Sequence, residues 1–126
     1  MIAGIGTDLC DVGRIQRALD RHGERFALKI LVEAEMARFR RHRRPAAYLA
    51  KRFAAKEAFS KAMATGIRFP VNWHNVSVEN EPSGKPVLRF SEPLAELLRK
   101  RGITAAHLSI TDEIGMASAY VILEKP

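Results

Sequence analysis

The stretch that most constrains the fold is the run from Lys51 to Met63, which reads Lys-Arg-Phe-Ala-Ala-Lys-Glu-Ala-Phe-Ser-Lys-Ala-Met and predicts a helix. At about 3.6 residues per turn, Phe53, Glu57 and Lys61 fall on one stripe of this helix. The stripe is mixed, and a charge beside the core is costly unless it is paired. Two interpretations stay open. Glu57 and Lys61 could form a surface ion pair, worth roughly 0.2–0.5 kcal/mol at this spacing, or the carboxylate could belong to a functional site.

The N-terminal residues 2–9 predict a buried strand that carries Gly4, Gly6 and Asp8 on one face. The two glycines leave that face bare, so another group could approach the backbone closely. Aspartate is disfavoured in strands, and Asp8 therefore has two interpretations. It could be a cap or turn residue at the end of the strand, or a carboxylate presented into a cleft floored by glycine.

The rest of the chain predicts helices first and then two hairpins separated by another helix. The expected elements are a helix capped by Asp11 and closed by Gly23, a helical pattern over Phe26–Arg41, a helix over Ala46–Ala64 with Gly66 as its C′ residue, strands over Val71–Glu79 and Val87–Phe90, a helix over Glu92–Arg101, and strands over Thr104–Thr111 and Met116–Leu123. The order β-ααα-ββ-α-ββ is typical of an α+β fold. At 126 residues the chain is expected to form one domain, 1–126. The last strand is nearly all apolar and is expected to be buried on both faces.

The charge of the chain predicts an acidic partner, because 21 Lys and Arg face 14 Asp and Glu, a net charge of +7. Arg14, Arg17 and Arg21 share one face of the first helix, and Arg25 follows just beyond it. Few acids compensate this stripe. It could be a solvated face, or it could dock an acidic helix in an enzyme or in a non-catalytic adaptor.

Composition excludes several other classes of protein. The single cysteine, Cys10, excludes an internal disulfide framework and a cysteine zinc cluster, and it fits a reducing compartment. No apolar run approaches the ~20 residues of a membrane span, and the N-terminus lacks the features of a signal peptide. We therefore expect a cytoplasmic protein with no membrane partner. The basic run 40–44 would suit RNA, but 7% aromatic residues offer few stacking platforms and no RRM or KH signature is present, so we expect no nucleic acid.

Asp8 and Glu57 lie on separate predicted elements, and two converging carboxylates suit Mg²⁺, which keeps waters and completes its shell with substrate phosphates. Lys61, one turn after Glu57, could reach a phosphate oxygen on that ion. Positioning and charge neutralisation do most of the work in phosphoryl transfer. The same two carboxylates could instead be an acid/base pair for sugar chemistry, although the lysine and the positive net charge favour an anionic substrate.

Three segments, Gly4–Leu9, Arg52–Ala62 and Thr65–Ile67, resemble the short holo-acyl-carrier-protein synthases, which are small bacterial 4′-phosphopantetheinyl transferases. The strand motif is weak alone, but the block that begins at Arg52, at this distance from Asp8, is highly specific. The resemblance covers the whole chain in length and element order. It implies the 4′-phosphopantetheinyl transferase fold and a homotrimer with active sites at the subunit junctions.

The resemblance also implies a reaction that supports fatty acid biosynthesis. The 4′-phosphopantetheine arm of coenzyme A moves to a serine of apo acyl carrier protein, and adenosine 3′,5′-bisphosphate leaves. In this reading Asp8 and Glu57 hold Mg²⁺, and either Glu57 or a metal-bound water is the base. Lys61 would be the second catalytic residue, because it neutralises phosphate charge and could protonate the leaving oxygen.

By the same resemblance, further residues bind the two substrates. The coenzyme A contacts would be Arg52, Lys61, Gly66, Lys85, Pro86 and His107, and the carrier-protein contacts would be Arg14 with Arg17, Arg21 and Arg25 in support. His107 could also be an ordinary strand histidine. Family members often have a second histidine where this chain has Asp112, so the role of Asp112 stays open, as do the range of carriers and of acylated coenzyme A accepted and the subunit that supplies each pocket wall.

Overall fold

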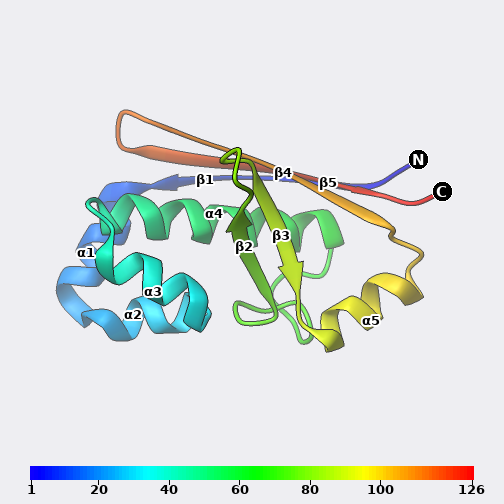
Figure 1. Ribbon diagram of the computed structural model, residues 1–126, viewed down its shortest axis with the longest axis horizontal. Helices are drawn as coiled ribbons and strands as arrows, with labels where there is room; N and C mark the ends of the chain where they lie inside the picture. The colour runs from blue at the N-terminus through cyan, green and yellow to red at the C-terminus, as the bar shows by residue number, and fades with distance from the viewer.

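A three-stranded antiparallel sheet joins the two ends of the chain in the computed structural model, which describes residues 1–126. Its strands are β1 (Ile2–Asp11), β5 (Met116–Glu124) and β4 (Ala105–Glu113), in the order β1-β5-β4. Because the first and last strands pair, the two termini lie side by side at one end of the molecule (Figure 1). The α-amino group of Met1 donates to the carbonyl of Lys125 over 2.7 Å.

Helix α4 (Pro45–Met63) runs along the inner face of this sheet and is the centre of the core (Figure 1). A Cβ at Gly4 would lie 2.1 Å from the carbonyl oxygen of Ala62, and one at Gly6 would lie 2.0 Å from that of Ala58. The group that approaches the bare face of β1 is therefore the backbone of α4. The predicted cleft floored by glycine is wrong, because the helix fills that space.

Helix α4 ends differently from the prediction. Ala64, directly after the helix, takes the left-handed conformation with φ 60°, and its N–H bonds back to the carbonyls of Ser60 and Lys61. Gly66, predicted as the C′ residue, lies two positions farther on with φ 63°. Both residues have positive φ, which glycine adopts without strain. Of the two positions, only the second is a glycine, and the first, directly after the helix, is Ala64.

Three short helices, α1 (Val12–His22), α2 (Glu24–Ile30) and α3 (Glu33–Arg41), lie beside one end of α4 (Figure 1). The predicted cap of α1 is confirmed, because the Asp11 carboxylate accepts from the N–H of Gly13 over 2.7 Å. The predicted single helix over 26–41 is wrong, because Leu31 and Val32 are extended and separate α2 from α3. The Glu35 side chain accepts from the N–H of Val32 over 2.9 Å and so starts a new helix there.

The order of elements is consequently β-αααα-ββ-α-ββ, with one helix more than predicted and the α+β class unchanged. The middle hairpin pairs β2 (Val76–Asn80) with β3 (Pro86–Phe90), and α5 (Glu92–Lys100) follows. The predicted start of β2 at Val71 is wrong, because the preceding residues form turns. The side chain of Asn72 accepts from the N–H of Asn75 over 3.0 Å, which closes one of them.

The second hairpin has a tighter turn than predicted. β4 continues to Glu113, and only Ile114 and Gly115, both with positive φ, connect it to β5. The sequence predicted that β5 is buried on both faces, and this prediction is wrong. Its inner residues, such as Val121, are fully buried, whereas Tyr120 on the outer face is exposed. The outer face of the sheet is open in a single chain.

A buried ion pair joins α3, α4 and β2. The ammonium of Lys56 lies 2.8 Å from a carboxylate oxygen of Glu35, and both side chains are almost completely buried. Lys56 also donates to the carbonyls of Ile30 and Trp73, and the other Glu35 oxygen accepts from the N–H of Val78 over 2.8 Å. These bonds satisfy both charges inside the core. No helix of the structure has the length and apolar character needed to cross a membrane.

Candidate active site

Asp8 and Lys61 meet where β1 lies along α4. The ammonium of Lys61 lies 3.2 Å from a carboxylate oxygen of Asp8 and donates to the carbonyl of Thr7 over 2.9 Å. Asp8 lies within β1 rather than at its end, so it is neither a cap nor a turn residue. Because the close contact at Gly6 fixes the strand on the helix, the position of Asp8 relative to α4 is fixed as well.

Glu57 lies one turn before Lys61 and shares the surroundings of Asp8. No ion pair joins Glu57 to Lys61, because the lysine pairs with Asp8 instead. Burial raises the pKa of Glu57, and the negative charge of Asp8 raises it further, while Lys61 opposes both. The surface ion pair left open by the sequence is therefore not formed. The arrangement is two carboxylates close enough to interact, with one lysine beside them.

These two carboxylates are the acidic side chains that the site offers to a cation. No cluster of three or more His, Cys, Asp or Glu side chains with metal-binding spacing occurs in the chain. Burial, with the nearby charge of Asp8, raises the pKa of the Cys10 thiol to about 11, so this thiol stays protonated at neutral pH. Two carboxylates with an exposed side fit Mg²⁺, which prefers one or two protein carboxylates with waters and substrate phosphates.

Arg52 lines a second site, a strongly basic cavity of about 480 Å³ at the start of α4. The cavity is lined by Arg38, Arg41, His42, Arg43, Tyr48, Lys51, Arg52 and Asn80. No acidic side chain lines it. Of these residues, only Arg52 is among the coenzyme A contacts expected from the sequence. The arginine run 40–44 is a signal for such a cavity, because its charge also suits a phosphorylated ligand, but charge alone does not choose among acidic partners.

Asn80 connects this basic cavity to the turn of the middle hairpin. Its side-chain oxygen accepts from Arg52 over 2.9 Å, and its side-chain nitrogen donates to the carbonyl of Gly84 over 3.0 Å. Lys85 and Pro86 follow directly in the chain, with Lys85 exposed. The structure thus places three of the residues expected to contact coenzyme A around one cavity and its adjoining turn.

The basic cavity and the paired carboxylates occupy different sides of α4. Arg52 and Glu57 are five residues apart, which is roughly 140° around a helix axis. His107 is farther away, on the outer face of the sheet, where its ring bonds to the carboxylate of Glu124. Gly66 is exposed with open space around it. Within one chain, the predicted coenzyme A residues therefore do not form a single pocket.

Asp112, whose role the sequence left open, lies near the basic cavity. One of its carboxylate oxygens is 4.0 Å from the ammonium of Lys51, a residue of the cavity wall. Asp112 is exposed at the far end of β4. It contacts neither Asp8 nor Glu57 through an ion pair or hydrogen bond, and its partner in the structure is this lysine.

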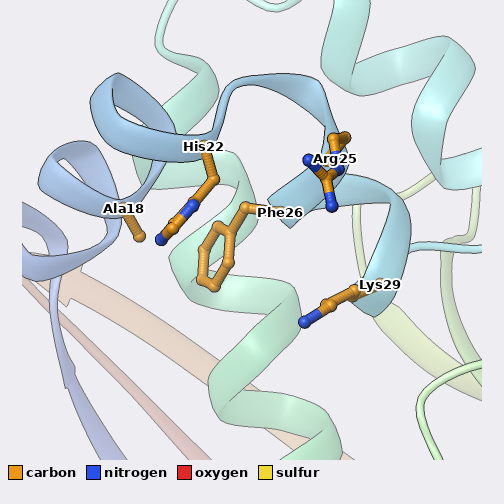
Figure 2. A pocket seen from close by; sticks show the side chains of 5 residues that line it. All are labelled: Ala18, His22, Arg25, Phe26 and Lys29. Atoms are coloured by element: carbon orange, nitrogen blue, oxygen red, sulfur yellow. The ribbon is translucent and has the colours of Figure 1, made fainter.

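The four arginines expected to receive an acidic partner are exposed, and none of them forms an ion pair. Arg14, Arg17 and Arg21 line a cavity of about 280 Å³ on α1 together with Ala18 and His22. A neighbouring cavity of about 310 Å³ lies between α1 and α2 (Figure 2). Its walls are Ala18, His22, Arg25, Phe26 and Lys29, so it combines positive charge with an aromatic ring. Four of the lining residues were not expected from the sequence, namely Ala18, His22, Phe26 and Lys29.

Comparison with known proteins decides the family. A family model described as the 4′-phosphopantetheinyl transferase superfamily matches residues 4–115. A protein of Nitrosomonas europaea named holo-[acyl-carrier-protein] synthase is 54% identical over 125 residues, which are 99% of this chain and 100% of that protein. The chain belongs to the holo-[acyl-carrier-protein] synthase family of these transferases.

Solved structures of this family share the fold. Holo-[acyl-carrier-protein] synthase from Neisseria meningitidis superposes with a TM-score of 0.96 at 42% identity, covering 99% of this chain and 100% of the other. The Bacillus anthracis enzyme, in complex with CoA (3′,5′-ADP), gives a TM-score of 0.83 at 37% identity, covering 100% and 99%. These findings confirm the family, the enzyme class and the α+β fold predicted from the sequence.

Proposed function

We propose that this enzyme transfers 4′-phosphopantetheine from coenzyme A to a serine of apo acyl carrier protein, in support of fatty acid biosynthesis. The observation that carries the proposal is the convergence of Asp8, Glu57 and Lys61 between β1 and α4 in a member of this family. A new bond forms between the serine oxygen and the phosphorus that bears the pantetheine arm. The bond from that phosphorus to the bridging oxygen breaks, and adenosine 3′,5′-bisphosphate leaves.

Asp8 and Glu57 would hold Mg²⁺ through their carboxylates. When bound, the ion neutralises charge on the pyrophosphate and so favours attack by an uncharged hydroxyl. Lys61 is half exposed and anchored on Asp8, so its ammonium can turn toward a phosphate oxygen and stabilise the charge on the departing group.

Glu57 is the group best suited to take the proton from the serine hydroxyl. Burial raises its pKa in the metal-free chain, and the negative charge of Asp8 adds to this rise. A bound cation would lower the pKa again, so Glu57 is assigned this role because of its position beside Asp8 and Lys61. A solvent-derived base remains the alternative.

The basic cavity around Arg52 is the best place for the phosphate-rich end of coenzyme A, because it is lined by six cationic or titratable basic side chains and no acid. The adjoining turn with Lys85 and Pro86 would cover the nucleotide, and Gly66 would border the pantetheine arm. Since Arg52 lies on a different side of α4 from Glu57, we place one bound coenzyme A between two subunits. His107, on the outer face of the sheet, would then contribute to the pocket formed with a neighbouring subunit.

A homotrimer fits this arrangement. The outer face of the sheet exposes large apolar side chains, including Ile5, Leu9 and Tyr120, which are 65%, 64% and 54% exposed. A contiguous apolar face of this kind usually marks a contact between proteins. Packing this face against another copy would bury it and bring the two halves of each site together.

The acyl carrier protein would dock on α1 and α2. Arg14, Arg17, Arg21 and Arg25 are exposed and have no acidic partner in the chain. Such a surface attracts an acidic protein mainly by raising the encounter rate and selecting the partner. The cavity lined by Phe26 (Figure 2) would accept an apolar side chain of the carrier.

A mass measurement tests the proposal. The enzyme is incubated with coenzyme A, Mg²⁺ and apo acyl carrier protein, and the carrier is then weighed by mass spectrometry. The carrier mass should rise by one phosphopantetheine, and excess EDTA should prevent the rise. An unchanged carrier mass contradicts the transfer, and a full rise in EDTA contradicts the metal.

A further inference from the structure

Tyr48 is a buried aromatic residue in the wall of the basic cavity and lies directly beside Arg52. The guanidinium carbon of Arg52 is 4.3 Å from the centre of the Tyr48 ring. Tyr48 is 4% exposed and Arg52 is 5% exposed. The ring thus holds one face of the guanidinium, while Asn80 holds one of its terminal nitrogens over 2.9 Å.

Both residues carry a buried polar atom that has no partner in the protein. These atoms are the hydroxyl of Tyr48 and the Nε of Arg52. A buried donor without a partner is costly, and native proteins rarely leave two such donors side by side. The guanidinium lies over the tyrosine ring and both residues line the basic cavity, so the two donors belong to the same stretch of its wall. A single tetrahedral anion offers a separate oxygen to each.

The charges around the cavity also favour an anion. The cationic side chains of Arg38, Arg41, Arg43 and Lys51 line the same cavity. Burial raises the pKa of Tyr48, so its hydroxyl keeps its proton and can donate at neutral pH. Burial and the nearby cations, with Lys51 and Arg52 first among these, lower the pKa of His42, so the cavity lacks this positive charge until an anion enters.

We propose that the Tyr48 hydroxyl and Arg52 Nε donate to the same phosphate monoester, which makes Tyr48 a specificity-determining residue for the 3′-phosphate of coenzyme A. The inference rests on the proposed function, which brings coenzyme A to this cavity. The Tyr48 hydroxyl adds a neutral hydrogen-bond donor to the charged donors of the cavity. Arg52 and its neighbours attract any phosphate, whereas a fixed hydroxyl beside Nε selects a terminal phosphate with free oxygens.

The variant Tyr48→Phe tests this assignment, because it removes the hydroxyl and keeps the ring beneath Arg52. Dissociation constants for coenzyme A and 3′-dephospho-coenzyme A are measured by calorimetry. The wild type should bind coenzyme A more tightly. A hydrogen bond to a charged group corresponds to roughly a tenfold change in affinity or more. Tyr48→Phe should therefore weaken coenzyme A about tenfold and leave 3′-dephospho-coenzyme A unchanged.

The outcomes separate the two proposals. If the wild type binds neither compound, the proposed function fails. If the wild type prefers coenzyme A and Tyr48→Phe keeps the same preference, the role of Tyr48 is wrong while the proposed function stands. An equal loss for both compounds would also overturn the role, because the hydroxyl would then support the cavity rather than read the phosphate.

The imidazole of His42 provides a second measurement in the wild type. The centre of its ring lies 5.2 Å from the centre of the Tyr48 ring. A phosphate dianion in the cavity stabilises the imidazolium, so adenosine 3′,5′-bisphosphate should raise the pKa of His42 measured by NMR titration, and adenosine should not. An unchanged pKa of His42 with the bisphosphate bound would place the phosphate elsewhere and overturn the inference.

Discussion

At the scale of single residues, Glu57 couples stability to activity. Its pKa is raised in the folded chain, chiefly by burial, so the folded state holds the proton more tightly than the unfolded state does. Stability from this group is therefore lost as pH rises from the usual glutamate pKa, about 4.3, toward the folded value. The charge that the proposed reaction needs therefore destabilises the folded chain.

The variant Glu57→Gln should consequently be more stable than the wild type at pH 7 without Mg²⁺, and the difference should vanish below about pH 4, where both side chains are neutral. Transfer should fall at least about 100-fold, as for loss of a general base. Urea denaturation at both pH values measures the stability, and the carrier mass assay measures the transfer. Glu24→Gln is the control. In the wild type the Glu24 carboxylate accepts from Arg40, which lowers its pKa, so this variant should gain no stability at pH 7. Equal stability of Glu57→Gln and wild type at pH 7 would contradict the raised pKa of Glu57 in the folded chain.

Lys56 is the residue whose loss should affect the fold most. The variant Lys56→Met leaves the Glu35 carboxylate buried without its cation and should lower the free energy of unfolding by about 3–5 kcal/mol. Urea denaturation measures the change. Lys61→Met is the matched control, because this lysine lies on the same helix and is half exposed, so it should cost about 1 kcal/mol or less. A similar small cost at Lys56 would mean that the buried pair does not hold α3, α4 and β2 together.

At the scale of elements, the contact between β1 and α4 positions Asp8 beside Lys61 in the candidate active site. The variant Gly6→Ala would place a methyl group 2.0 Å from the carbonyl oxygen of Ala58 and should cost about 3 kcal/mol or more, at the upper end of overpacking. Gly13→Ala is the control, since its Cβ would meet side-chain atoms and no backbone, namely the Asp11 carboxylate at 3.0 Å and the Arg17 guanidinium at 3.3 Å. Thermal unfolding should show a large loss for the first variant and little change for the second. Comparable melting temperatures would show that the strand can shift without cost.

Local patterns predicted the elements whose ends are set by neighbouring residues. Asp11 caps α1 as expected, because its partner, the N–H of Gly13, is two residues away. The break before Glu33 escaped prediction, because the Glu35 carboxylate that stabilises it also depends on Lys56 and on the N–H of Val78. Contacts over such distances in the chain leave no periodic pattern.

Contacts between distant parts of the chain also explain why one site could be proposed from the sequence and the other could not. Asp8 and Glu57 could be proposed from the sequence, because each stands out within its own element. The basic cavity combines the end of α3, the start of α4 and Asn80 of β2, and no single segment reveals it. The resemblance to a family supplied Arg52, but the buried contact of Arg52 with Tyr48 required the structure.

At the scale of the whole molecule, charge should control the encounter with the carrier. The variant Arg21→Glu should raise the KM for acyl carrier protein several-fold at low salt and leave the KM for coenzyme A unchanged. The difference should shrink near 1 M salt, where the screening length falls to about 3 Å. Lys100→Glu changes the same charge on α5, at the other end of the molecule from α1 (Figure 1), and should have little effect. A loss that salt does not reduce would point to packing rather than to charge.

The outer face of the sheet should decide the assembly. In the variant Ile5→Asp, a carboxylate replaces a side chain that is 65% exposed on a single chain but would be buried between subunits, where an unpaired charge is costly. The wild type should sediment as three chains and the variant as one, with weaker coenzyme A binding because each pocket loses its second wall. Ile114→Asp is the control, since Ile114 lies in the β4–β5 turn. If Ile5→Asp still sediments as three chains, another surface joins the subunits, and His107 on this face cannot belong to a neighbour's site.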